Sequence, residues 1–122
     1  MRTLGTQVRL RRLMRAVSES VDRLVSEPAE IEMANAVAAR LLELVDATVA
    51  SWRSERLAEG SGPAAFDRYV NGAFDTIRFA VAGLGQRGAD VRLLATDFAE
   101  AALPLEVFLK GLDHAPVLQR TA

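Results

Sequence analysis

The chain has 122 residues, of which 50% are hydrophobic, 25% are charged and none is cysteine. This length suits a single domain with one hydrophobic core, and the lack of cysteine excludes disulfides, thiol catalysis and thiolate metal sites. The 15 basic and 16 acidic residues nearly cancel, so no overall charge attracts nucleic acid or an acidic membrane surface. No apolar run reaches the roughly 18 residues of a membrane span, and the basic start lacks the continuous apolar core of a signal peptide. We therefore expect a soluble, cytoplasmic protein.

The first predicted helix runs from about Thr6 to Val25, with apolar residues recurring on one face. Arginines cluster between Arg9 and Arg15 and offer contacts to phosphates. We favour a simpler interpretation, in which they form a solvated face whose long side chains cover apolar surface, and we expect no nucleic-acid partner. The apolar face consists of Leu10, Leu13, Met14, Val17, Val21, Leu24 and Val25.

The strongest pattern lies between Ile31 and Arg56, where an apolar side chain recurs every three or four residues. It predicts a helix from Pro28 to about Leu57, with Ser26 as its N-cap. Because further apolar residues widen this face, the helix should lie between several partners. The face consists of Ala34, Ala38, Leu41, Val45, Thr48 and Trp52, and it is widened by Val37, Leu44 and Val49.

Residues 59–63 form a predicted loop, and Pro63 is suited to open a third helix that ends near Ala82. Gly72 lies inside this helix, at a cost of about 1 kcal/mol relative to alanine. Residues 83–88 spell Gly-x-Gly-x-x-Gly. In a dinucleotide-binding fold this motif follows a strand, whereas here it follows a helix, so we predict a helix-to-helix turn. The inner face of the third helix is predicted to hold Phe66, Tyr69, Val70, Ala73, Phe74, Ile77 and Val81.

A fourth helix is predicted to begin after Asp90, which can cap it. Pro104 lacks a backbone amide hydrogen, so it should kink this helix or begin a short fifth one. Gly111 suits a helix end, and residues 113–122 are predicted to form a flexible tail. The inner face should hold Val91, Leu94, Ala95, Phe98, Ala102 and Leu105, followed by Phe108, Leu109 and Leu112.

No stretch alternates with period two for long enough to predict a strand. The sequence therefore predicts an all-α fold, a bundle of four main helices with the last one kinked or split at Pro104. We assign residues 1–112 to one helical domain and residues 113–122 to the C-terminal tail.

The residues that usually hold metals and haem are scarce. A di-iron bundle needs glutamates paired with Glu-x-x-His on facing helices, and the single histidine, His114, falls in the predicted tail. Met14 and Met33 are the only alternative haem ligands in predicted helices, and both suit packing better. We expect no metal and no cofactor.

Acidic pairs are the remaining candidates for catalysis. Glu27 with Glu30, and Glu43 with Asp46, loosely resemble the paired acidic motifs of all-α MazG-type nucleotide pyrophosphohydrolases, in which carboxylates bind magnesium. However, the two pairs lie about 20 Å apart on one predicted helix. Because no serine lies in a Gly-x-Ser-x-Gly turn either, we predict no catalytic residues. A magnesium-dependent nucleotide hydrolase is kept as an alternative.

Four aromatic residues are candidates for an interface or a ligand site. Trp52, Tyr69, Phe74 and Phe98 all lie on predicted inner faces, and large aromatic side chains either fill a core or anchor a partner. We favour the core for these residues. An apolar ligand pocket inside the bundle, around Tyr69 or Asn71, is a further alternative.

Two stretches resemble a known family. Residues 21–28, with sequence VDRLVSEP, and residues 82–98, with sequence AGLGQRGADVRLLATDF, are similar to parts of the haem-free, globin-like input domain of RsbR-type stressosome co-antagonists and PucR-type regulators. The resemblance implies a globin-like helical domain that dimerises and passes a signal to an attached or partner protein without chemistry. We therefore predict a non-catalytic regulatory or protein-interaction module, with a homodimer and a regulatory protein as its partners.

Overall fold

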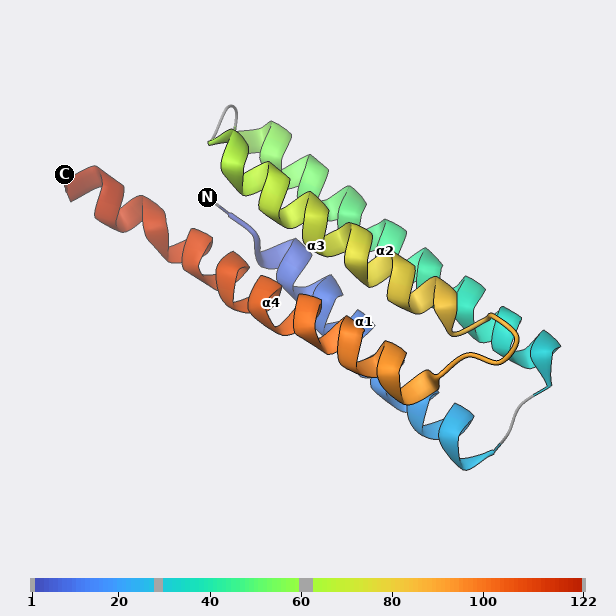
Figure 1. Cartoon of the computed structure of the whole chain (residues 1–122). Helices are drawn as coiled ribbons and strands as arrows, with labels where there is room; N and C mark the ends of the chain where they lie inside the picture. Colours follow the sequence, from blue (N-terminus) through green and yellow to red (C-terminus); the bar gives the residue numbers. More distant parts are fainter. Residues whose placement is uncertain (1, 28–29, 60–62, 122) are drawn as a thin grey trace.

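Four antiparallel helices form the structure. The computed structural model describes residues 2–27, 30–59 and 63–121, and describes side chains as far as His114 except that of Glu59. The helices are α1 (Leu4–Ser26), α2 (Ile31–Glu59), α3 (Ala64–Gly83) and α4 (Val91–Thr121). Each helix packs against two neighbours, in the cyclic order α1, α2, α3, α4 (Figure 1). This is an up-and-down four-helix bundle, so the predicted all-α fold with four main helices is confirmed.

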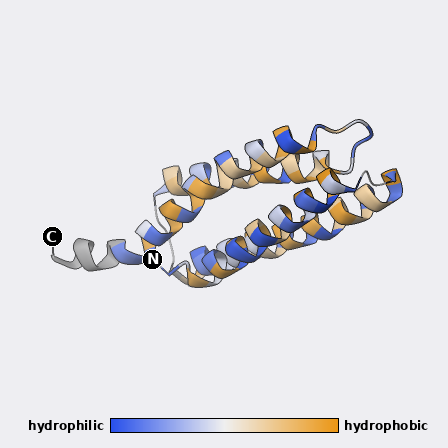
Figure 2. Ribbon diagram, turned by 90° about the horizontal axis from the view of Figure 1, so that it is seen from below, coloured by the Kyte–Doolittle hydropathy of each residue, from blue (hydrophilic) through white to orange (hydrophobic). Residues whose placement is uncertain are grey.

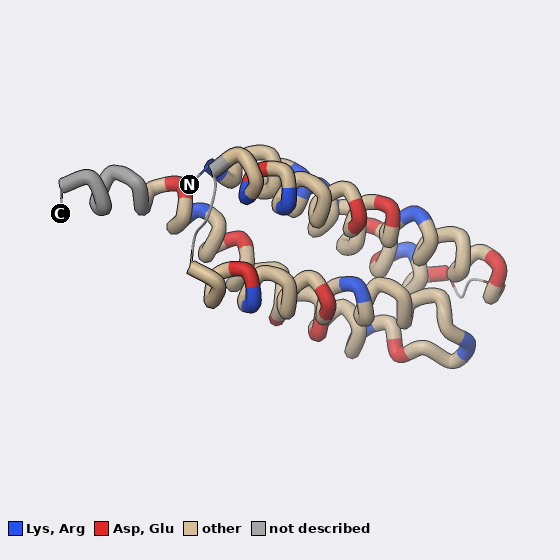
Figure 3. The backbone as a smooth tube through the Cα atoms, turned by 90° about the horizontal axis from the view of Figure 1, so that it is seen from above, with Lys and Arg blue, Asp and Glu red and all other residues tan. Residues whose placement is uncertain are grey.

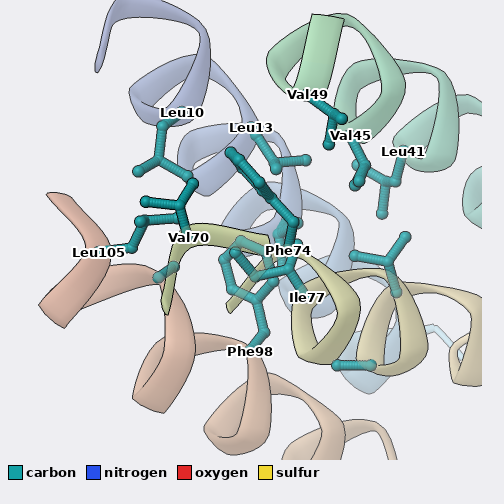
Figure 4. Packing of buried hydrophobic residues seen from close by; sticks show 14 of the residues in the cluster. Leu10, Leu13, Leu41, Val45, Val49, Val70, Phe74, Ile77, Phe98 and Leu105 are labelled. Atoms are coloured by element: carbon teal, nitrogen blue, oxygen red, sulfur yellow. The ribbon is translucent and has the colours of Figure 1, made fainter. Parts of the chain in front are cut away.

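Amphipathic helices account for this arrangement. Hydrophobic and hydrophilic residues are interspersed along the described part of every helix (Figure 2). The apolar side of each helix turns inward. The cluster of buried residues draws on all four helices, as Leu13, Val45, Phe74 and Leu105 illustrate (Figure 4). The predicted inner faces are therefore confirmed, with two exceptions: Val25 and Tyr69 are 38% and 42% exposed.

The ends of the helices agree only partly with the predicted caps. The Asp90 carboxylate accepts a hydrogen bond from the Leu93 amide at 3.1 Å, so its predicted role as the cap of α4 is confirmed. The prediction for Ser26 was wrong, because Ser26 is the last residue of α1 and α2 starts only at Ile31. Pro28, expected in the first turn of α2, lies outside the described residues.

The glycine-rich segment after α3 is a turn between helices, as predicted. Gly88 has a φ of +73°, a backbone conformation that side chains disfavour and glycine adopts freely. Gly83 allows close packing against α4, since a Cβ atom there would lie 2.8 Å from Leu94 Cδ2 and the leucine side chain would have to shift. The motif therefore serves a close connection between α3 and α4.

The last helix is continuous through Pro104. Of the two predicted alternatives, the split with a short fifth helix is therefore wrong, and the kink stays a prediction. Pro104 cannot donate a hydrogen bond to the Glu100 carbonyl, and both residues lie on the exposed side of α4. Beyond the proline, Leu105, Leu109 and Leu112 are buried. Their packing holds the helix in place where one backbone hydrogen bond is missing.

Gly111 does not end α4, which continues to Thr121. The backbone of the predicted tail is thus helical over residues 113–121, and its flexibility stays a prediction. The sole histidine, His114, is exposed on this helix.

An ion pair joins α2 to α3 close to their connection. The Arg56 guanidinium donates two hydrogen bonds of 2.7 Å to the Asp67 carboxylate, and its charged end lies 5.6 Å from the centre of the Trp52 ring. Such a two-pronged contact has a more defined geometry than a single ion pair. It orients the end of α2 against the start of α3.

Charges of both signs are distributed along the helices (Figure 3). Arg9, Arg11, Arg12 and Arg15 are exposed, as the interpretation of a solvated face predicts, and Arg11 lies 3.7 Å from Glu106. Over the residues that the structure describes, no helix combines the length and the apolar character that a membrane crossing requires.

Candidate functional site

The four aromatic residues chosen from the sequence divide into two groups. Trp52, Phe74 and Phe98 are at most 5% exposed and belong to the core cluster (Figure 4 labels the last two). Tyr69 is 42% exposed on the side of α3 that faces α4. Only Tyr69 is therefore accessible to a partner or ligand without a change in the fold.

Tyr69 lies at one end of a surface groove between α3 and α4, which we call the α3–α4 groove. Its ring centre is 4.7 Å from that of Phe108, which also meets Phe66 edge-to-face at 5.4 Å. The groove has a volume of about 590 Å³. It is lined by Arg68, Tyr69, Gly72, Ala73, Thr76, Phe79, Ala80, Asp97, Glu100, Ala101 and Pro104.

Phe79 is the most prominent apolar residue of this groove. It is 80% exposed, the largest exposed fraction of any aromatic side chain given for the described residues. Leaving a phenylalanine in water forgoes roughly 1.5–3 kcal/mol of burial. Phe79 was not among the residues selected from the sequence. The signal for it was present, since it is the aromatic residue of α3 that falls outside the predicted inner face.

Gly72 opens a gap in the same surface. It lies in the middle of α3, where glycine costs about 1 kcal/mol relative to alanine. A Cβ atom added there would meet no other atom within 4 Å, in contrast to Gly83. Packing within the described part of the chain therefore gives no reason for a glycine at this position.

The groove also has an uneven distribution of charge. The register of the two helices is set by Tyr69 against Phe108 at one end and by Gly83 against Leu94 at the other. In this register Arg68 lies at the end marked by Tyr69, Asp97 lies toward the opposite end, level with Ala80, and Glu100 lies nearer the middle, level with Ile77. Among the described residues, these three side chains form no ion pair with one another.

The acidic residues considered as magnesium ligands are not brought together. Glu30 lies just before α2 and Glu43 lies well along it, about 20 Å away at 1.5 Å per residue. Asp46 forms an ion pair of 2.8 Å with Arg78 on α3, and Glu27 is exposed at the end of α1. Within the described ranges, no three acidic, histidine or cysteine side chains gather closely enough to hold a metal ion.

The residues weighed for haem or ligand binding are also separated. Met14 is half-buried beside the core, and Met33 is 51% exposed. Asn71 is exposed on α3 and does not line the α3–α4 groove. An apolar hollow of about 230 Å³ lies between α1 and α4, with Val17, Phe98 and Leu103 among its lining residues. It is smaller than the roughly 300 Å³ at which ordinary ligand pockets begin.

Sequence reasoning missed a polar cluster at the start of α1. Asp113 on α4 accepts hydrogen bonds from the Thr3 amide and the Gln7 side chain, and the Thr3 hydroxyl donates to the Leu109 carbonyl at 2.8 Å. Glu55 on α2 accepts a hydrogen bond of 2.8 Å from the Thr6 amide. Both carboxylates thus stabilise the positive end of α1. The cluster joins three helices and has a structural role.

The pKa of the Glu55 carboxyl is raised above its ordinary value. Burial is the main cause, and the negative charge of Asp113 adds to the rise, while the hydrogen bonds from Thr6 and Gly5 act in the opposite direction. Neither Glu55 Oε2 nor Thr6 Oγ1 has a hydrogen-bond partner among the described residues. The charged form of Glu55 is therefore less stable in the folded protein than in the unfolded chain.

We expect Glu55→Gln to stabilise the protein at neutral pH. A raised folded-state pKa means that ionisation of Glu55 lowers folding stability. This penalty is absent at low pH and fully present once the pH exceeds the folded-state pKa. The gain of the variant over the wild type should therefore shrink as the pH falls through the raised folded-state pKa, and it should be lost below 4.5, the ordinary pKa. Urea unfolding at a series of pH values measures the difference in the free energy of unfolding between the variant and the wild type. The control is Glu43→Gln, at an exposed position of the same helix. A difference that does not change with pH would contradict the prediction.

Comparisons with protein-family models, with curated proteins and with solved structures found no match to this chain.

Proposed function

We propose that this protein is a cytoplasmic, non-catalytic regulatory or protein-interaction module that self-associates. The observation that carries the proposal is the exposure of Phe79 and Tyr69 along the α3–α4 groove. Exposed aromatic residues that gather on one surface mark sites of protein interaction more often than random surface does. The resemblance to RsbR-type and PucR-type input domains implies the same role.

The distribution of polar groups supports a role without chemistry. The buried or half-buried polar side chains of Thr3, Gln7, Glu55 and Asp113 bind helix ends. The acidic pairs that a magnesium-dependent hydrolase would need are separated, because Glu27 and Glu30 lie between α1 and α2 whereas Glu43 and Asp46 lie well along α2. These polar residues account for the cohesion of the bundle, whereas the α3–α4 groove exposes two aromatic side chains.

A small apolar ligand in the α3–α4 groove is the second candidate. The volume of about 590 Å³ lies within the range of small-molecule pockets, and Tyr69 offers a hydroxyl beside apolar rings. If this candidate is correct, the purified protein can carry a bound small molecule, whereas the first candidate predicts that it carries none.

Native mass spectrometry of the freshly purified chain separates the two candidates. We expect a mass that is a whole multiple of the chain mass, with two chains and no added compound. A discrete added mass on a single chain would favour the ligand-binding function. A bare monomer, also at high protein concentration, would contradict the proposed self-association.

A further inference from the structure

We infer that the α3–α4 groove is the interface of a homodimer with two-fold symmetry, in which Phe79 of each copy fills the gap at Gly72 of the other. The inference rests on the proposed self-association. It adds the surface through which the chain associates and the register of the two copies, and it names a second copy of this chain as the partner. Two independent features of the groove support it: one is steric and the other is electrostatic.

The steric feature is the spacing of one projecting residue and one gap. Phe79 and Gly72 are seven residues apart, which is close to two helical turns, so they lie on the same side of α3. A two-fold axis that crosses α3 midway between them, near Thr76, places each Phe79 over the Gly72 of the other copy. Phe79 is 80% exposed, and beyond the neighbouring backbone of α3 no atom of the described residues lies within 4 Å of the place that a Cβ atom of Gly72 would take. The second copy would thus bury an otherwise exposed phenylalanine.

The same axis gives Gly72 a role. A helix interior disfavours glycine, and an added Cβ at position 72 would meet nothing within the chain. In the dimer that Cβ would lie between the two α3 helices, where it would compete with the incoming ring. Small residues at a helix crossing let the backbones approach closely, and only a glycine leaves the whole space free.

The electrostatic feature is the separation of charge along the groove. Arg68 and Asp97 line the same groove at opposite ends, roughly 18 Å apart along the helices at 1.5 Å per residue in the register described above. In a two-fold dimer, a contact between one residue of the first copy and another residue of the second copy is repeated with the two copies exchanged. Every such contact therefore occurs twice. The axis near Thr76 exchanges the two ends of the groove. It therefore brings Arg68 of one copy toward Asp97 of the other, while Glu100, which is level with Ile77 in this register, lies near the axis.

Charge complementarity of this kind selects a second copy over an unrelated partner. A surface that is basic at one end and acidic at the other complements itself when it is rotated by two-fold symmetry. None of these charges is used in an ion pair among the described residues. The steric and electrostatic features locate the axis at nearly the same place on α3, although they involve different residues.

Sedimentation equilibrium of the full chain and its variants tests the interface. We expect a wild-type dimer, and we expect Phe79→Asp to raise the dimer dissociation constant at least about tenfold. Phe79 is exposed, so the variant should fold, which circular dichroism checks. Leu57→Asp is the matched control, because Leu57 is 83% exposed and lies on α2, away from the groove. It should leave the dissociation constant unchanged.

Charge reversal tests the register of the dimer. Arg68→Glu and Asp97→Arg should each weaken the dimer, because each places like charges opposite one another. The double variant should recover an affinity within a few-fold of the wild type. Gly72→Leu should also weaken the dimer without loss of folding. Failure of the double variant to recover would overturn the proposed register.

The outcomes separate this inference from the proposed function. A wild-type dimer that is unaffected by Phe79→Asp and by Gly72→Leu would overturn the α3–α4 interface and would leave self-association in place through another surface. A wild-type chain that stays monomeric up to its solubility limit would overturn both. Loss of the dimer in Leu57→Asp alone would assign the interface to the other side of the bundle.

Discussion

Trp52→Ala should lower the free energy of unfolding by about 3–5 kcal/mol, the range for a large aromatic side chain removed from a core. Trp52 is 1% exposed and belongs to the cluster to which all four helices contribute. Its removal loses both the burial of the indole and the packing of the residues around it. The guanidinium of Arg56 also loses the ring that it lies against at 5.6 Å.

Urea unfolding followed by far-UV circular dichroism measures this loss, because Trp52 is the only tryptophan and its removal abolishes the fluorescence signal. Leu57→Ala is the control, since Leu57 is 83% exposed on the same helix. Its effect should stay within about 0.5 kcal/mol. If the two variants lost similar amounts of stability, Trp52 would not belong to the core.

Leu109→Ala should cost about 2–5 kcal/mol, the range for a buried leucine. The expected size follows from the course of α4, which continues past Pro104 and docks Leu105, Leu109 and Leu112 into the bundle. The Leu109 carbonyl also accepts a hydrogen bond from the Thr3 hydroxyl. The second half of α4 is therefore part of the cooperative fold, and a cavity there should affect the whole bundle.

Leu103→Ala supplies the comparison for this prediction. It is the same substitution on the same helix, at a side chain that is 54% exposed, whereas Leu109 is fully buried. Unfolding measured by circular dichroism should show a much larger loss for Leu109→Ala. Equal losses would mean that the segment after Pro104 folds and unfolds independently of the rest.

The positions of the helices were predictable because their signal is local. The first helix was expected from Thr6 to Val25 and observed from Leu4 to Ser26. Periodic burial defines such a helix without reference to any other part of the chain. Cap residues are less informative. Ser26 has the chemistry of an N-cap, yet the backbone of α1 continues through it, so its role depended on where the preceding helix stopped.

The candidate site was only partly predictable. Tyr69 was assigned to an inner face, but it lies at the margin of that face, where burial depends on how closely α4 approaches. Phe79 was detectable in principle as an aromatic residue outside the inner register. The partners of Glu55 and Asp113 were not, because Thr3 and Asp113 are 110 residues apart in the chain. No periodicity relates residues at such a separation.

The sequence by itself determined the fold class, the number of helices and most of the core, because the burial of one helix face is encoded in spacings of three and four residues. Only the tertiary structure decided which residues beyond those faces meet one another. It showed that α4 stays continuous at Pro104, that Glu55 and Asp113 bind the start of α1, and that Phe79, Gly72 and Arg68 share one groove. These contacts depend on the rotation of each helix about its axis and on the register between neighbours. Both are set by the packing of all four helices together, and neither can be read from one helix alone.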